Sequence, residues 1–126
     1  MMAGRISDRL DEAVALARVL TCRDAAARAL TAAGWPTDPD ALDGALSGGR
    51  LVHRAVSQAR ARCYDELDVD DGYAWAYART LVDAARRAAH CEETVAGAGR
   101  SRMDAASAIG ARAAAEAVGD LLEVGS

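Results

Sequence analysis

Apolar residues recur at helical spacing along most of this chain, and the clearest case is the segment 73–93. Residues placed about 100° apart, as in an α-helix, gather its tyrosines and most of its Ala, Leu and Val side chains on one half of the cylinder. The other half carries Arg79, Asp83, Arg86, Arg87 and His90. A globular protein buries so wide an apolar face against other helices. We therefore expect residues 73–93 to form the central helix of a bundle.

The N-terminal third of the chain predicts helical structure from Ser7 to Ala33. Ser7 can cap the first helix, and the sequence Thr-Cys-Arg-Asp at 21–24 resembles a weak capping box. The segment is therefore either one helix or two, and we expect a kink or a short break at 21–24. Gly34 ends it as a C-terminal cap, since the following Trp-Pro pair cannot continue a helix.

The middle of the chain predicts a short helix over 38–45, because Pro39 stands at an early helical position. The sequence Ser-Gly-Gly at 47–49 is expected to interrupt it, since glycine is unfavourable inside helices. A new helix is then expected from Arg50 to about Leu67, followed by a turn over 68–72.

The last helix is expected from Ser101, paired with Asp104 as a cap, to about Val124, after a small flexible connection at 94–100. The predicted fold is thus all-α: one domain over residues 1–126, a compact bundle of four main helices plus one short helix.

Composition supports this fold class and suggests the kind of source organism. Ala supplies 32 of the 126 residues, and β-branched and aromatic residues are scarce. Lys, Asn and Phe, the residues with A/T-rich codons, are absent. We infer a GC-rich bacterial genome, for which an actinobacterium would fit.

Charge and hydropathy argue against several function classes. A net charge of −4 disfavours a general nucleic-acid binder, and no apolar run is long enough for a membrane span. The charged N-terminus has no signal-peptide pattern, so we expect a cytoplasmic protein. Cys22, Cys63 and Cys91 are odd in number and lie on or beside apolar faces, which favours buried free thiols.

Acidic residues cluster at 65–71, with Asp65, Glu66, Asp68, Asp70 and Asp71. Clustered carboxylates can hold Mg²⁺ or Ca²⁺, but the spacing does not match a calcium-binding EF-hand loop. An acidic helix start beside a turn explains the same residues.

A polar strip is expected on the helix that begins at Arg50: His53, Ser57, Arg60 and Tyr64 follow one another four, three and four residues apart. His beside Ser suggests a base and a nucleophile, although the strip contains no acidic residue to orient the histidine. A solvated surface or one edge of an oligomer interface is the alternative.

The outer side of the 73–93 helix is the other candidate. Arg79, Arg86 and His90 could bind an anionic ligand or a partner's carboxylates, and the alternative is a solvated charged surface. Trp75 lies at the border of that surface, and with Trp35 it either closes a pocket or fills space left by the many Ala side chains.

Small residues form a row of spacing four on the last helix, at Ala106, Gly110 and Ala114. Such a row lets two helices approach closely. Because several helices have apolar arcs wider than a monomer of this size readily buries, we take this row as the seam of a homo-oligomer, with a dimer favoured.

Three function hypotheses remain open from the sequence. The leading one is a helical interaction module without catalysis, acting through self-association or a protein partner. The second is a protein that binds a small anionic ligand in a cleft formed by Trp75, Arg79, Arg86, His90, His53 and Tyr64. The third is a divalent-metal-dependent enzyme that uses the acidic cluster. No cofactor motif is present in the sequence.

Overall fold

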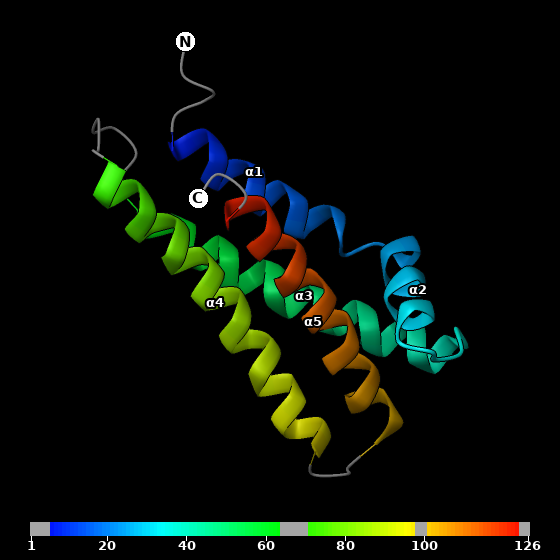
Figure 1. Cartoon of the computed structure of the whole chain (residues 1–126). Helices are drawn as coiled ribbons and strands as arrows, with labels where there is room; N and C mark the ends of the chain where they lie inside the picture. The colour runs from blue at the N-terminus through cyan, green and yellow to red at the C-terminus, as the bar shows by residue number, and fades with distance from the viewer. Residues whose placement is uncertain (1–5, 64–70, 98–100, 124–126) are drawn as a thin grey trace.

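The computed structural model of the chain is all-α (Figure 1). The structure describes residues 6–63, 71–97 and 101–123, with side chains from Asp8 onward in the first range and from Ala76 onward in the second. Five helices occupy the described ranges: α1 (Ile6–Val19), α2 (Arg23–Ala32), α3 (Pro39–Ala61), α4 (Asp71–Gly97) and α5 (Arg102–Glu123). The predicted compact, all-α bundle is confirmed.

Helices α3, α4 and α5 pack on one another and form the body of the molecule, while α1 and α2 pack against α3 and α5 (Figure 1). Helix α4 runs beside α5 in the opposite direction (Figure 1). The core between α1, α3, α4 and α5 is built around Leu10, Val52, Val56, Leu81 and Val118, each fully buried. A second, smaller core surrounds Leu30 of α2.

The first two helices, which the sequence left open as one helix or two, are separate, with the break at residues 20–22. Cys22 caps α2: its Sγ accepts a hydrogen bond from the backbone N–H of Ala25 at 3.4 Å. At the other end Gly34 takes a positive φ of 76°, and the N–H of Trp35 bonds the carbonyl of Leu30 at 2.8 Å. This is a Schellman cap, which requires glycine at the left-handed position.

The expected interruption at Ser47–Gly49 is wrong, because α3 continues through it from Pro39 to Ala61. Gly48 and Gly49 are both buried, and each faces a neighbouring backbone. A Cβ on Gly48 would lie 1.9 Å from the carbonyl oxygen of Ser107 in α5, and one on Gly49 would lie 3.1 Å from that of Leu20. Gly48 therefore allows close contact with α5, and Gly49 allows close contact with the break between α1 and α2. The short helix of the bundle is α2, of 10 residues, and not residues 38–45.

The start of α3 is tied to the start of α5. Asp38, the N-cap residue of α3, accepts two hydrogen bonds of 2.6 Å from the Arg102 guanidinium, whose carbon lies 5.6 Å from the centre of the Trp35 ring. The hydrogen bond from Arg102 holds the pKa of the Asp38 carboxyl below its usual range. This cluster joins the end of α2, the start of α3 and the start of α5.

Candidate functional site

A groove of about 240 Å³ lies between α4 and α5. Its floor is formed by small residues, Ala89 of α4 with Ala115 and Gly119 of α5, which are all buried. Seven ionisable residues line it: Arg86, His90 and Glu93 from α4, and Arg112, Glu116, Asp120 and Glu123 from α5. The groove thus combines a narrow apolar floor with charged walls of both signs.

Helical spacing explains why these side chains meet. The α4 residues lie four and three positions apart, and the α5 residues lie four, four and three apart, so each set forms one stripe along its helix. Helices α4 and α5 run antiparallel (Figure 1). The two stripes line opposite walls of the groove, with the small residues of the floor between them.

Ion pairs cross the groove at both ends. The Arg86 Nη2 lies 3.0 Å from Oε1 of Glu123, and the Arg112 Nε lies 3.8 Å from Oε1 of Glu93 and 3.5 Å from Oε1 of Glu116. All these side chains are at least 42% exposed, so each pair contributes little to stability. The four carboxylates and two guanidiniums of the walls sum to a charge of −2 (−4 + 2).

Arg86 lies above Gly119. A Cβ placed on Gly119 would have a single neighbour within 4 Å, the Arg86 Nη2 at 3.8 Å. No backbone approaches Gly119, unlike Gly48, Gly44 or Gly110, so the glycine leaves open space beneath the guanidinium. A flexible, solvent-exposed side chain therefore covers this part of the floor.

Two of the predicted ligand-binding residues, Arg86 and His90, line the groove. Arg79 is an exposed residue of α4 outside it, and His53 belongs to α3 and does not contribute to it. Tyr64 and the side chain of Trp75 lie outside the described part of the chain. Trp35, the other aromatic considered, stacks against Arg102 instead.

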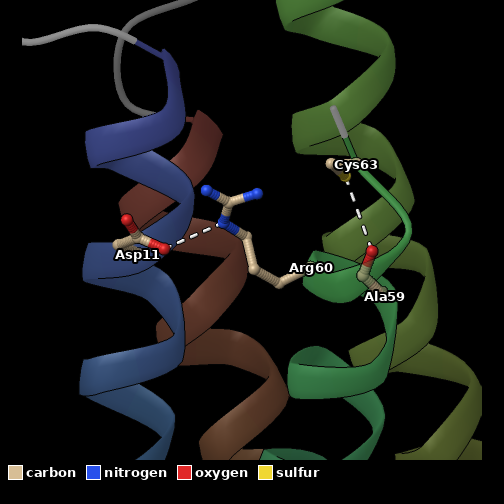
Figure 2. Close-up of polar contacts among 4 residues, drawn as sticks. All are labelled: Asp11, Ala59, Arg60 and Cys63. Carbon is tan, nitrogen blue, oxygen red and sulfur yellow. Dashed lines mark hydrogen bonds and ion pairs between the residues drawn. The ribbon is translucent and has the colours of Figure 1, made fainter. Parts of the chain in front are cut away.

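Three residues of the polar strip, His53, Ser57 and Arg60, lie on α3, and Tyr64 lies outside the described residues. The Ser57 Oγ lies 3.3 Å from Nε2 of His53, and both residues are half-buried. An acidic residue does approach the strip, but it binds the arginine: Nε of Arg60 donates to Oδ1 of Asp11 in α1 at 2.9 Å (Figure 2). Asp11 therefore joins α1 to α3 through Arg60.

The small-residue row on α5 lies inside the chain. Ala106, Gly110 and Ala114 are buried, and a Cβ on Gly110 would lie 2.1 Å from the carbonyl oxygen of Ala45 in α3. The row does bring two helices unusually close, but these are α3 and α5 of the same molecule. A second copy has no access to these three residues while the chain keeps this fold.

Two further expectations concern cysteines and metals. Cys22 and Cys91 are exposed and Cys63 is half-buried, so the expectation of buried thiols is wrong for the first two.

The acidic cluster at 65–71 lies outside the residues whose side chains are described. Among the described residues no group of three or more His, Cys, Asp and Glu side chains could hold a metal ion.

Sequence reasoning missed the α5 wall of the groove, namely Glu116, Asp120 and Glu123 with Gly119 between them. The signal was present, because Arg112, Glu116, Asp120 and Glu123 form a charged stripe at helical spacing. What the sequence does not show is that this stripe faces the one on α4 that contains Arg86 and His90.

Comparisons with protein-family models, with curated proteins and with solved structures found no match to this chain. Within the described ranges, no helix has the length and apolar character needed to cross a membrane.

Proposed function

We propose that this protein is a small helical interaction module whose α4–α5 groove binds a protein partner, without catalysis of its own. The observation that supports the proposal is the groove itself: an open channel along two helices, with a floor of small residues and walls of charged side chains. Charged walls of this kind suit a partner that brings its own charged side chains.

The character of the groove favours a protein partner over a small molecule. Small-molecule sites are mostly enclosed and apolar, with a few convergent polar groups. Here seven of the ten lining residues are ionisable. The earlier hypothesis of an anionic ligand loses support at Arg86 and Arg112, because carboxylates of α4 and α5 already lie beside both guanidiniums.

Self-association remains the second form of the same proposal, with a dimer as its simplest case. It would need a surface other than the α3–α5 seam. The exposed large apolar residues of the described chain are Val19, Val95 and Met103, one each on α1, α4 and α5. The groove is therefore the better-supported surface.

Site-specific photocrosslinking tests the proposal in the cells that make the protein. A photoreactive benzophenone residue replaces Glu116 on the wall of the groove, and in a matched control it replaces Glu12, an exposed residue of α1. We expect a discrete protein adduct from position 116, absent from position 12 and lost when Gly119→Leu fills the floor.

The mass of the adduct separates the two forms of the proposal. An adduct of twice the 13.1 kDa chain mass identifies self-association, and any other mass identifies a different partner. Equal crosslinking from positions 116 and 12, or none from position 116, contradicts a partner in the groove.

A further inference from the structure

The carboxylates that line the groove outnumber its guanidiniums. Arg112 lies between Glu93 and Glu116, and Arg86 is bound to Glu123. Asp120 has no ion-pair partner within the described part of the chain, although it lines the same wall. The groove can therefore accept additional positive charge, and a further anion would meet repulsion.

Arg86 occupies the position that such a positive charge would take. Its guanidinium lies above the open space at Gly119 and donates to the Glu123 carboxylate at 3.0 Å. About 60% of the Arg86 side chain is exposed, so it can swing into solvent at the loss of one weak ion pair. The place that Arg86 would leave, above Gly119 and beside the Glu123 carboxylate, is one that a guanidinium already fills.

We propose that the occupant of the groove is a basic segment of the partner protein. An arginine or lysine of that segment displaces Arg86 from above Gly119 and pairs with Glu123 and Asp120. Arg86 thus acts as an internal competitor that keeps the groove covered until the partner binds. This inference rests on the proposed function, because it names the chemistry of the partner at the same groove.

Arginine suits the site better than lysine for a geometric reason. A planar guanidinium can donate to two carboxylates at once, whereas an ammonium group acts as a point charge. Glu123 and Asp120 lie on the same wall of α5, three residues apart and hence on one side of the helix. Among basic segments, those rich in arginine are therefore expected to bind more tightly.

Fluorescence anisotropy with the full chain tests the inference, with fluorescein-labelled hexaarginine as the probe and hexaglutamate as the negative control. We expect hexaarginine to bind and hexaglutamate not to bind. Amide chemical shifts of the ¹⁵N-labelled protein should change upon hexaarginine addition mainly at Ala115, Gly119 and their neighbours.

A matched pair of variants separates competition by Arg86 from general charge attraction. Arg86→Ala and Arg79→Ala each remove one positive charge from α4, but only Arg86 lies over Gly119. We expect Arg86→Ala to tighten hexaarginine binding about two- to five-fold, the amount expected for release of one exposed ion pair. Arg79→Ala should change it by less than about 1.5-fold, because salt screens a distant exposed charge.

A second pair tests the acceptors. Asp120→Asn should weaken hexaarginine binding about two- to five-fold, and Glu12→Gln, which removes a carboxylate from α1, should leave it unchanged. Circular dichroism confirms that each variant is folded before its affinity is compared.

Several results would overturn the inference. Equal tightening by Arg86→Ala and Arg79→Ala, or shift changes away from the groove, would show general attraction to an acidic protein. If hexaarginine added before irradiation fails to suppress the protein adduct from position 116, the proposed function stands and the basic partner is wrong. If hexaarginine binds at Gly119 but no protein is captured there, the interaction module itself is wrong.

Discussion

Gly48 of α3 lies directly against the backbone of Ser107 in α5, so that a Cβ on Gly48 would be 1.9 Å from the Ser107 carbonyl oxygen and 2.7 Å from the Ala111 amide nitrogen. One turn earlier, a Cβ on Gly44 would be 2.6 Å from the carbonyl oxygen of Met103. The contacts on both helices advance by four residues together, so α3 and α5 run parallel. They meet backbone to backbone.

This contact predicts opposite effects for two glycine-to-alanine substitutions. Gly48→Ala adds a methyl group where only backbone atoms can move aside, and overpacking of this kind costs about 1–3 kcal/mol. Gly119→Ala meets no backbone and gains about 0.5–1 kcal/mol from helix propensity. Urea unfolding followed by circular dichroism measures both. A Gly48→Ala variant as stable as the parent protein would contradict the α3–α5 contact, and a destabilised Gly119→Ala variant would contradict the open space at Gly119.

The Asp38–Arg102 pair predicts a pH-dependent contribution to stability. Because the hydrogen bond from Arg102 lowers the pKa of Asp38 in the folded protein, the unfolded chain binds this proton more readily. The contribution is therefore present above the ordinary pKa of 3.8 and is lost as the pH falls through the lowered folded value.

Thermal unfolding of Asp38→Asn checks this sign. The variant should unfold at a lower temperature than the parent protein at neutral pH, and the difference should narrow as the pH falls below 3.8. Asp83→Asn removes a carboxylate with no ion pair in the described chain and serves as the control for net charge. A difference for Asp38→Asn that grows at acidic pH would be inconsistent with the pair.

The helices and their ends could be predicted from the sequence where local chemistry decides them. Gly34 ends α2 because only glycine readily takes its backbone conformation, and Ser101 caps α5 because its Oγ accepts from the N–H of Asp104 at 3.0 Å. The break before Cys22 follows from the same kind of signal. Each of these features depends on residues within five positions along the chain.

Features that depend on a distant partner could not be predicted in this way. The low helix propensity of Gly48 and Gly49 predicts a helix break at these positions. Both are nevertheless helical, and the backbones of α5 and Leu20 pack against them. The groove shows the same limit. Arg86 and His90 were identifiable as a charged surface of one helix, but Glu123 reaches Arg86 from 37 residues away. Packing of α4 on α5 turns that surface into a site.

The Arg60–Asp11 pair predicts an asymmetry between its two partners. Only 11% of the Arg60 side chain is exposed, against 67% for Asp11, so the arginine also contributes the packing of its aliphatic stem between α3 and α1 (Figure 2). Asp11→Ala should cost about 0–1 kcal/mol of unfolding free energy, and Arg60→Ala should cost clearly more. Equal losses from the two substitutions would show that the ion pair alone is responsible.

The weak sulfur cap that Cys22 provides at the start of α2 predicts that a better cap residue at this position will stabilise the protein. Its sulfur is an exposed, weak acceptor for the N–H of Ala25 at 3.4 Å, whereas a serine hydroxyl is a preferred N-cap acceptor. Cys22→Ser should therefore raise the unfolding free energy by up to about 1 kcal/mol, and Cys22→Ala, which leaves the amide without a side-chain acceptor, should lower it.

Cys91→Ser exchanges the same atoms at an exposed position inside α4 and should change stability by less than about 0.5 kcal/mol. If urea unfolding gives the same result for serine and alanine at position 22, the cap contributes nothing. In that case packing of Ala25, Ala26 and Leu30 would hold α2 in place.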